Sequence, residues 1–565
     1  MGRLGNLVVA AVAAAVTAGT VVAGCASSPP STQGSIEKAA PEAVAAAASA
    51  PRPNVLVIEA DDMRVDDLPY MPRTRHWFQD RGLTFESSFS PNPLCCPARA
   101  SFLTGRYSHN HGVLSHREPY GFGSFDDHDT LATRLSEAGY RTALVGKYLN
   151  GYGIDPVHGT DSDPSVTYVP PGWTQWYGSV DVSTPPANPY GGSTYNYFHL
   201  TSNVNGVLQS WPDEYTTDVT AAQTRNVIFR FEAAREPKPW FVWWTPVAPH
   251  HGDPDEDDDP ADAVNRRGGV EHWLSPARPE WVKGRFDDVI PRSPGIPRTH
   301  QPEENRADKP RYLRYLPYLS REERTAVRDI TRQRAEALYA LDAEVDKVMT
   351  MLQRRGLLDS TMIVFTSDNG FYLGEHLKRE GKGTPHEPSI RVPLLVAGPG
   401  VTHGRRYDPV STVDLGPTIA SWAGTSLARP DGDDLSRLIQ DGDRGWDRAV
   451  VVEGLMGEPA YDPSLGHTGP LSYVGLRTGR WEVVRYASGE TEWYDLWRDP
   501  LQLSSLQFRG VPPVVRDALR QALRQYGRCA EEACRAPLPE VLREDADDVR
   551  RILEHQRQAE DHYYG

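Results

Sequence analysis

The residues with the clearest chemical potential form one short stretch around a cysteine. Cys95 is followed by Pro97 and Arg99, and a Thr-Gly turn ends the stretch near Gly105. The chain has only 5 cysteines, and this spacing is neither that of a disulfide scaffold nor that of a zinc finger. We therefore predict that Cys95 is a reactive residue. The alternative is a buried pair of thiols, Cys95 and Cys96, at the start of a helix.

Two apolar runs far apart in the chain each end in oxygen-bearing side chains. Residues 53–60 are predicted to form a buried parallel strand that ends in an Asp-Asp pair, and residues 361–367 a strand that ends in Asp-Asn. If the strands are parallel neighbours, both pairs meet at one edge of a sheet, where hard oxygen ligands favour Ca²⁺ or Mg²⁺ over zinc. Taken alone, the Asp-Asp pair is also typical of a helix cap and solvated turn. The four side chains are Asp61, Asp62, Asp368 and Asn369.

The pattern Cys95-x-Pro97-x-Arg99 resembles the signature of the formylglycine-dependent sulfatases, which belong to the alkaline phosphatase superfamily. In that family a formylglycine-generating enzyme oxidises the first cysteine to formylglycine (3-oxoalanine), whose hydrated aldehyde is the nucleophile. The resemblance therefore implies that Cys95 is converted and that Cys96 is the variable residue of the motif. It also implies that the Asp-Asp and Asp-Asn pairs bind Ca²⁺, with Mg²⁺ as the alternative, and that this ion contacts residue 95.

Basic residues elsewhere match those that hold the sulfate group in this family. Lys147 resembles the first sulfate-binding lysine and Lys382 the second. Arg99, with a fixed charge and a planar fork, suits the hydrated aldehyde or the metal's carboxylates, or else a structural salt bridge. Many relatives carry a histidine where this chain has Leu149, followed by Asn150. The Gly-Lys-Tyr-Leu-Asn form and the double cysteine resemble the N-acetylglucosamine-6-sulfatase branch, which implies a sulfated sugar as substrate and adds Asn150 to its contacts.

Histidines are candidates for proton transfer and for substrate contact. His250, which follows a strand and a proline, resembles the histidine that faces the bridging oxygen of the ester, and we expect it to protonate the leaving group. His251 is the alternative for this role. His386 stands where relatives usually carry Tyr and is a further candidate for contact with the substrate.

These groups must be positioned by a framework in which strands and helices alternate. Apolar runs predict strands over 141–147 and 239–245, and 3/4 spacing predicts a long amphipathic helix over 322–352. After residue 445 the pattern changes to short strands. With the resemblance, this predicts an α/β fold: a large, mostly parallel sheet flanked by helices, as in alkaline phosphatase, and a smaller C-terminal antiparallel α+β subdomain. Residues 151–203 are expected to form long loops whose aromatic residues stack on sugar rings or merely pin the loops; these are Trp173, Trp176 and Tyr177.

The N-terminus indicates export. Residues 1–25 carry Arg3, an apolar run shorter than a membrane span, and an end that resembles a bacterial lipobox at Cys25. We expect a cell-surface lipoprotein with a lipid anchor on Cys25; a secreted protein cleaved near Ala26 is the alternative. The expected divisions are an export signal over 1–25, an Ala/Ser/Pro-rich tether over 26–52, a catalytic domain over 53–445, and a C-terminal subdomain and tail over 446–565.

Composition and charge leave few other functions open. The 565 residues include 39% hydrophobic residues, which is typical of a globular protein, and a net charge of −16 argues against a nucleic-acid partner. The alternatives to a sulfatase are a phosphonate or phosphodiester hydrolase of the same superfamily, and a surface lipoprotein that binds sulfated glycans without cleaving them. In an exported protein, Cys529 and Cys534 could close a small disulfide loop or remain two unpaired thiols.

Overall fold

A computed structural model describes residues 52–79, 81–160, 165–265, 267–298, 303, 306–456 and 471–564. The expected export signal, the lipobox at Cys25 and the tether up to residue 51 lie outside the described residues. Among the helices that the structure describes, none combines the length and the apolar character that a bilayer span requires.

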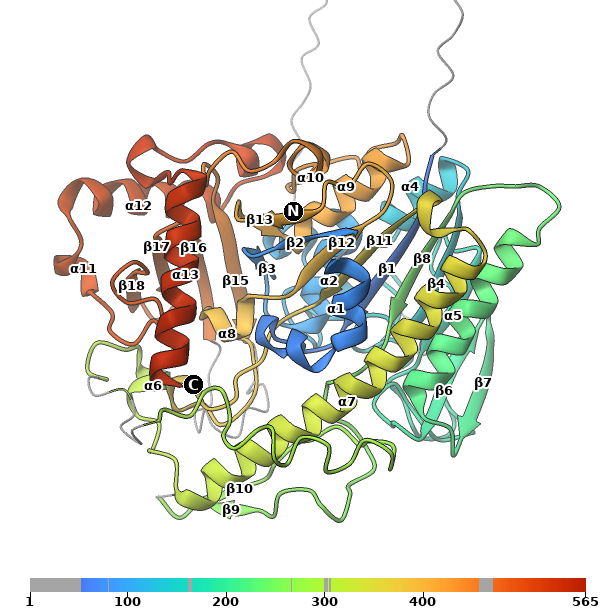
Figure 1. Ribbon diagram of the computed structural model, residues 1–565, viewed down its shortest axis with the longest axis horizontal. Helices are drawn as coiled ribbons and strands as arrows, with labels where there is room; N and C mark the ends of the chain where they lie inside the picture. The colour runs from blue at the N-terminus through green and yellow to red at the C-terminus, as the bar shows by residue number, and fades with distance from the viewer. Residues whose placement is uncertain are drawn as a thin grey trace, which may run out of the picture. The chain divides into compact units, whose positions relative to one another are not determined.

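A ten-stranded mixed sheet forms the centre of the described chain (Figure 1). Its strand order is β13-β2-β12-β11-β1-β8-β4-β5-β6-β7, and the five consecutive strands from β11 to β5 run parallel to one another. This confirms the predicted mostly parallel sheet. The strands are β1 (Asn54–Ala60), β2 (Gly82–Phe85), β4 (Arg141–Lys147), β5 (Gln175–Ser179), β6 (His199–Val204), β7 (Val207–Pro212), β8 (Trp240–Thr245), β11 (Thr361–Ser367), β12 (Leu394–Ala397) and β13 (Gly404–Arg406).

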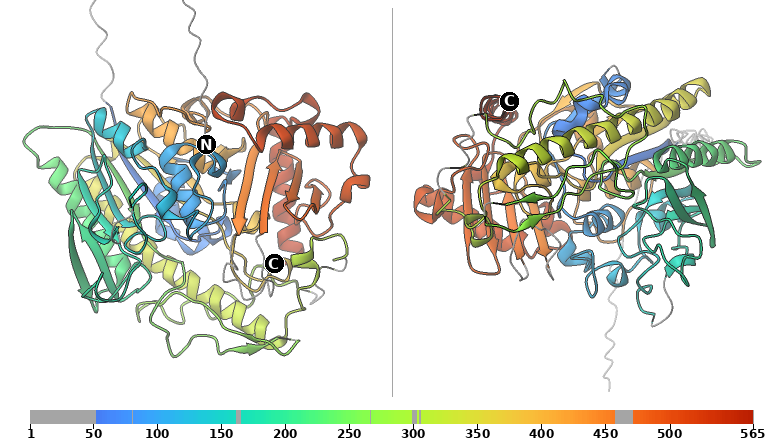
Figure 2. Two further views of the ribbon diagram at one scale, coloured as in Figure 1. Left: turned by 180° about the vertical axis from the view of Figure 1, so that it is seen from behind. Right: turned by 90° about the horizontal axis from the view of Figure 1, so that it is seen from below.

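Helices cover both faces of this sheet because its central strands are apolar on both sides. Alternate residues of β1 belong to two separate hydrophobic clusters, with Val55 and Val57 in one and Leu56 and Ile58 in the other. Figures 1 and 2 show α5 and α7 lying along one face. The principal helices are α1 (Pro72–Gln79), α2 (Cys95–Thr104), α3 (Ser108–His111), α4 (Leu131–Glu137), α5 (Thr216–Glu232), α7 (Arg321–Arg354) and α9 (Leu415–Trp422).

The long helix predicted over 322–352 is confirmed as α7. Its start is fixed by a capping box, in which the Ser320 hydroxyl accepts from the Glu323 amide and the Glu323 carboxylate accepts from the Ser320 amide. The helix packs on α5 and α1 and leads the chain to β11.

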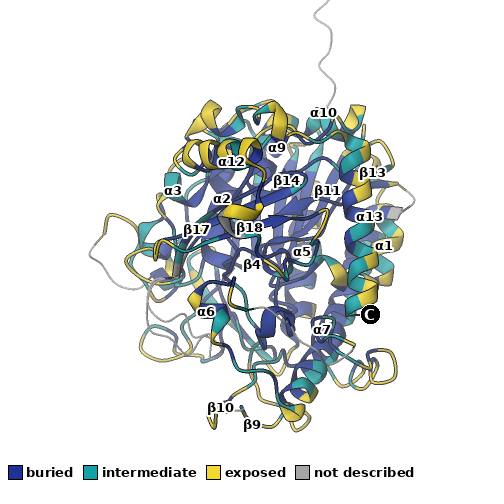
Figure 3. Ribbon diagram, turned by 90° about the vertical axis from the view of Figure 1, so that its left-hand side faces the viewer, coloured by how far each residue is buried: buried dark blue, intermediate teal, exposed yellow. Residues whose placement is uncertain are grey.

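A four-stranded antiparallel sheet follows, as predicted for the C-terminal part. Its strands run in sequence order: β15 (Val450–Met456), β16 (Leu471–Arg477), β17 (Trp481–Tyr486) and β18 (Thr491–Asp495). The helices α12 (Pro513–Tyr526) and α13 (Ala546–Tyr563) pack beside it, and Figure 3 shows buried strands beneath exposed outer turns of α12. Between the two helices, Cys529 and Cys534 form a disulfide.

The interpretation of residues 151–203 as loops over the site is wrong in part. The segment contains β5, which pairs with β4, and the start of β6. Trp176 is fully buried on β5, and Trp173 stacks on Phe241 of β8 with ring centroids 6.0 Å apart. Trp176 therefore belongs to the hydrophobic core, and the partly buried Trp173 packs against it, which favours the alternative that these aromatic residues pin the segment.

Candidate active site

The ends of β1 and β11 bring the two oxygen-bearing pairs together. The strands are parallel neighbours, with Ala60 opposite Ser367, so the residues that follow them emerge side by side. The Asp62 amide donates to Asp368 Oδ1 at 3.1 Å, and Asn369 Nδ2 donates to Asp62 Oδ1 at 2.7 Å. The predicted pairing of these strands is confirmed, and the four side chains lie in one buried cluster.

This cluster has the donor set of a site for a hard divalent cation. Asp62 has a left-handed backbone (φ 66°), which is uncommon for a residue other than glycine and is found often at functional sites. Asp62 Oδ2 and Asn369 Oδ1 are buried and accept no hydrogen bond from any described residue. Buried oxygens without a donor are costly, and carboxylate and amide oxygens are ligands that Ca²⁺ and Mg²⁺ prefer. The residues present therefore fit such an ion.

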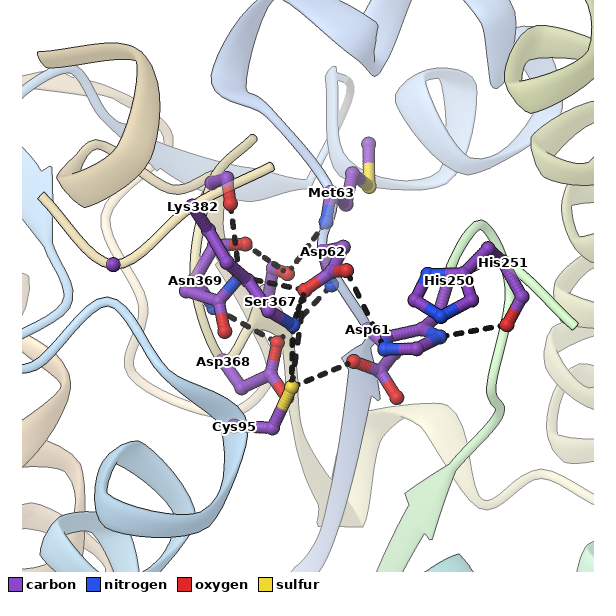
Figure 4. Close-up of polar contacts among 12 residues, drawn as sticks. Asp61, Asp62, Met63, Cys95, His250, His251, Ser367, Asp368, Asn369 and Lys382 are labelled. Carbon is purple, nitrogen blue, oxygen red and sulfur yellow. Dashed lines mark hydrogen bonds and ion pairs between the residues drawn. The ribbon is translucent and has the colours of Figure 1, made fainter. Parts of the chain in front are cut away.

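Cys95 is the first residue of α2 and lies against this cluster (Figure 4). Its Sγ is 3.2 Å from Asp61 Oδ1, 3.8 Å from Asp62 Oδ1 and 2.7 Å from Lys382 Nζ. The start of a helix carries unpaired amides and the positive end of the dipole, which favour a developing negative charge. The neighbouring Cys96 has its Sγ 3.7 Å from the carbonyl of Asn150 and belongs to a hydrophobic cluster.

Three cations neutralise the carboxylates. Lys147, at the end of β4, places its Nζ 2.5 Å from Asp61 Oδ2. Lys382 forms an ion pair with Asp62. The Arg99 guanidinium is fully buried, and its Nε donates to Asp368 Oδ2 at 2.9 Å. The cations, carboxylates and cysteine assigned from the sequence thus occupy one site and come from β1, α2, β4, β11 and the loops that follow these strands.

Burial and charge shift the acidity of these groups. Burial raises the pKa of the Cys95 thiol well above its usual value, and Asp368 and Asp61 raise it further. Burial alone would lower the pKa values of Lys147 and Lys382, but the carboxylates of Asp61 and Asp62 outweigh it, so both ammonium groups are held charged. An unmodified thiol at position 95 is therefore protonated and a poor nucleophile.

His250 lies at the edge of the site on the loop after β8. Its Nε2 is 3.7 Å from Asp62 Oδ2, and its Nδ1 is 2.7 Å from the His251 carbonyl. Because a carbonyl can only accept, Nδ1 carries the proton and Nε2 is left with a lone pair in the neutral ring. Burial lowers the pKa of His250 well below its usual value, and the nearby His251, Lys382 and Lys147 add to this effect.

His386 does not serve as the expected substrate contact. Its side chain is fully buried, with Nδ1 2.9 Å from the Tyr372 hydroxyl and Nε2 3.3 Å from Glu492 Oε1 on β18. Both ring nitrogens are therefore used inside the protein, where His386 links the loop after Lys382 to the small sheet.

Sequence reasoning missed two residues that contact the site. Arg334 of α7 donates to the carbonyls of Asp62 at 2.5 Å and Pro249 at 3.1 Å. Its position on the apolar, inward face of an amphipathic helix could have identified it. Tyr195, on the loop between β5 and β6, lies with its ring centroid 5.1 Å from Lys147 Nζ and 4.9 Å from the ring of His250.

Comparison with known sequences identifies one family. The family model described as Sulfatase matches residues 53–425. An arylsulfatase of Chlamydomonas reinhardtii is 28% identical over 541 residues, which cover 88% of this chain and 78% of the relative. The N-acetylglucosamine-6-sulfatase of Capra hircus is 27% identical over 534 residues, which cover 87% of this chain and 86% of the relative.

Solved structures show the same fold at lower identity. A protein in complex with its substrate D-glucosamine-2-N,6-O-disulfate matches with a TM-score of 0.64 and 19% identity, over 86% of this chain and 98% of that chain. The phosphonate monoester hydrolase of Agrobacterium radiobacter matches with a TM-score of 0.58 and 22% identity, over 87% and 99%. At these identities the likeness extends to the fold alone.

Proposed function

Because this chain belongs to the sulfatase family and hydrolyses sulfate esters, we propose that Cys95, after oxidation to formylglycine, is its nucleophile. The observation that carries the proposal is the position of Cys95 Sγ, 3.2 Å from Asp61 Oδ1 and 2.7 Å from Lys382 Nζ, at the start of α2. The thiol itself is a poor nucleophile here, whereas the hydrated aldehyde would offer two hydroxyls at the same place.

The proposed reaction uses these two hydroxyls in turn. The first hydroxyl gives up its proton, and its oxygen bonds to sulfur as the bond from sulfur to the ester oxygen breaks. The ester oxygen takes up a proton and leaves as the alcohol. The second hydroxyl then loses its proton, the carbon–oxygen bond to the sulfate breaks, and sulfate departs as the aldehyde returns. A serine or cysteine at this position has no second hydroxyl and could not complete the second step.

Lys147, Lys382 and Arg99 would hold the sulfate group and stabilise its negative charge, which is commonly the largest contribution to such catalysis. In the structure each already faces a carboxylate of the cluster within a buried site. An anionic ester would therefore meet three fixed cations and little competing water.

His250 is the proposed proton donor to the leaving group. Its Nε2 is the ring nitrogen not used by the His251 carbonyl. Since burial and neighbouring cations keep the pKa of His250 low, the ring is neutral in the resting site and must gain its proton when the anionic substrate arrives. His251 lies beside it, with ring centroids 4.1 Å apart, and is the alternative donor.

We propose that Asp61, Asp62, Asp368, Asn369 and residue 95 hold a divalent cation, Ca²⁺ in preference to Mg²⁺. The carboxylates and amide oxygens are hard ligands, and they emerge from loops that could supply the larger coordination number of Ca²⁺. Such an ion would supply fixed positive charge beside the sulfate. The protein's own part is to hold the oxygens together, which it does by joining the ends of β1 and β11 through the Ser367 hydroxyl and the Met63 amide at 2.9 Å.

The proposed substrate is a sulfated sugar. This rests on the relatives named N-acetylglucosamine-6-sulfatase and on the Gly-Lys-Tyr-Leu-Asn sequence that contains Lys147 and Asn150.

We further propose that the chain is exported, anchored through Cys25 and matured by a formylglycine-generating enzyme, as its first 25 residues and the Cys95 motif suggest.

Mass spectrometry of the peptide that contains Cys95 tests the proposal directly. Conversion lowers the peptide mass by about 18 Da, because a thiol becomes an aldehyde. We expect this loss in the wild-type protein and in Cys96→Ser, and its absence in Cys95→Ser together with loss of turnover. An intact thiol in an active enzyme, or steady hydrolysis by Cys95→Ser, would disprove the proposed nucleophile. Assays on sulfate and phosphonate esters of one leaving group compare the two chemistries.

A further inference from the structure

Tyr195 contacts three residues of the proposed active site, although nothing in the sequence motif includes it. Its ring lies 5.1 Å from the Lys147 ammonium and 4.9 Å from the His250 ring, and its hydroxyl is 2.6 Å from Asn150 Nδ2. One side chain thus touches a proposed sulfate-binding cation, the proposed proton donor and the proposed substrate amide.

The backbone around Tyr195 is fixed to the loop that carries His250. Gly252 passes so close to Tyr195 that a Cβ at this glycine would lie 2.1 Å from the Tyr195 carbonyl oxygen. The next residues, Asn196 and Asp253, form a parallel β-bridge. The Tyr197 hydroxyl donates to the His250 carbonyl at 2.6 Å. The two loops therefore form one unit, which limits the positions open to the Tyr195 ring.

The Asn150 amide has two polar atoms, and the protein uses only one of them. Nδ2 bonds to the Tyr195 hydroxyl, whereas Oδ1 is buried and has no hydrogen-bond partner among the described residues. If the Asn150 amide were turned over, the Tyr195 hydroxyl would donate to Oδ1, and Nδ2 would be left without a partner. In either orientation one buried polar atom of Asn150 is left without a partner among the described residues, and a group that can both donate and accept, such as a sugar hydroxyl, would satisfy it.

We propose that Tyr195 adapts this sulfatase site to a hydroxylated leaving group: its ring positions Lys147 and His250, and its hydroxyl fixes the Asn150 amide so that the amide's second polar atom binds a hydroxyl of the substrate. The inference rests on the proposed function and deepens it by naming the feature that selects a sugar sulfate over an aryl sulfate. Tyr195 acts through its three neighbours, so it is a positioning residue.

The ring and the hydroxyl can be separated by substitution. Tyr195→Phe keeps the ring and removes the bond to Asn150, which frees the amide to turn. Tyr195→Leu removes both. The neighbouring Tyr190, which is 54% exposed, offers the matched control Tyr190→Phe on the same loop. Each variant is purified, and the fraction of Cys95 converted to formylglycine is measured. Its kcat and KM are then determined on D-glucosamine 6-sulfate and on 4-nitrophenyl sulfate.

We expect Tyr195→Phe to lower kcat/KM for the sugar sulfate by about tenfold, the value of one neutral hydrogen bond, and for the aryl sulfate by far less. Asn150→Ala should likewise lower kcat/KM for the sugar sulfate more than kcat/KM for the aryl sulfate. Tyr195→Leu should lower kcat on both substrates, because Lys147 and His250 lose their common support. The Tyr190→Phe variant should retain both activities.

Two outcomes would overturn the inference while leaving the proposed function intact. In one, Tyr195→Phe lowers the two activities equally or not at all. In the other, the wild-type protein cleaves the aryl sulfate and not the sugar sulfate. Failure of the proposed function would give a different result. In that case a wild-type protein whose Cys95 is not converted would still hydrolyse the sulfate ester. If Tyr195→Leu does not fold, Tyr195→Phe and Asn150→Ala still decide the question.

Discussion

At the scale of single residues, the site is a set of opposite charges in near balance. The carboxylates of Asp61, Asp62 and Asp368 each face a cation, and all six side chains are buried or nearly so. Such a cluster tolerates an anionic ester only if positive charge is added, because each substrate brings a negative charge into a low-dielectric space. A divalent cation bound at the free oxygens of Asp62 and Asn369 would supply it.

Removal of divalent cations should therefore abolish sulfate release. We expect the enzyme dialysed against a chelator to lose activity and to recover it with Ca²⁺ more fully than with Mg²⁺. The thermal midpoint should also rise with Ca²⁺ concentration, since a ligand that binds only the folded state stabilises it. Asp368→Asn keeps the shape of the side chain but removes a charge. It should weaken both the recovery of activity and the rise of the thermal midpoint with Ca²⁺. Full activity of a protein shown to be free of metal would contradict the assigned site.

The sequence allowed prediction of those site residues whose types and neighbours are informative. Cys95 stands in a short motif, and the Asp-Asp and Asp-Asn pairs end continuous apolar strands. Tyr195 could not be found in this way, because it lies on an irregular loop whose place beside Lys147 depends on pairing between β5 and β6 and on the loop after β8. Its role follows from tertiary contacts alone.

At the scale of elements, α7 supports the site through one buried cation. Arg334 bonds the carbonyls of Asp62 and Pro249 and lies 4.2 Å above the ring of Phe371. It therefore joins the loops after β1 and β8, which carry two of the carboxylates proposed to bind the metal, Asp61 and Asp62, and His250.

Arg334→Met should cost about 1–3 kcal/mol of stability, because it leaves two buried carbonyls without donors. Activity should fall as well, because the loops after β1 and β8 lose their common anchor. Urea unfolding and steady-state assays measure the two effects. Arg328→Met, on the same helix but 31% exposed, is the matched control and should behave like the wild type. Equal results for the two variants would show that Arg334 has no such role.

The short helix α3 carries a histidine whose charge couples folding to pH. His109 Nε2 is 2.8 Å from the Cys529 carbonyl and Nδ1 is 2.8 Å from Glu453 Oε2, so both nitrogens donate. Burial alone would lower the pKa of His109, but the hydrogen bond and charge of Glu453 outweigh it and raise the pKa to about 9. The side chain is 21% exposed.

The pKa of His109 in the folded protein lies above its unfolded value of about 6.5. Protonated His109 therefore contributes its full stabilisation of the folded state below pH 6.5, and this stabilisation is lost as the pH rises to about 9. At about 1.36 kcal/mol per pKa unit, this rise in the pKa of His109 corresponds to about 3 kcal/mol of stability. The stability difference between the wild type and His109→Asn, from urea unfolding, should therefore shrink between pH 6 and pH 9.5. His128→Asn, at a site 82% exposed, is the control. A difference that stays constant over this range would contradict the assignment.

Helices and strands with a long apolar or periodic sequence could be predicted, whereas short strands within Gly- and Pro-rich segments could not. The apolar runs of β1, β8 and β11 and the periodicity of α7 made these elements evident. In contrast, β5 has five residues, Gln-Trp-Tyr-Gly-Ser, within a Gly- and Pro-rich segment. Its strand conformation is imposed by pairing with β4 on one side and β6 on the other.

At the scale of the whole described molecule, the C-terminal part is tied to the segment that follows the Cys95 helix. The Cys529 carbonyl accepts from His109 and from Asn110, and the Glu531 amide donates to Asp431, which also accepts from Asn110. The disulfide between Cys529 and Cys534 closes the loop that presents these groups. The C-terminal segment therefore helps to hold α3 in place.

Loss of this disulfide should reduce stability without removing activity. Closing so small a loop is worth about 2 kcal/mol in the chain-entropy model, and in a protein of this size that corresponds to about 2 °C in the thermal midpoint. Cys529→Ser/Cys534→Ser should show this decrease, and a reductant should lower the midpoint of the wild type to the same value while leaving the variant unchanged. Sulfate release at 25 °C should persist in the variant, because the long-range hydrogen bonds that join the disulfide loop to the rest of the described chain go to His109, Asn110 and Asp431 and not to the side chains around Cys95. A reductant that lowers the midpoints of both proteins equally would show that the stabilisation comes from elsewhere.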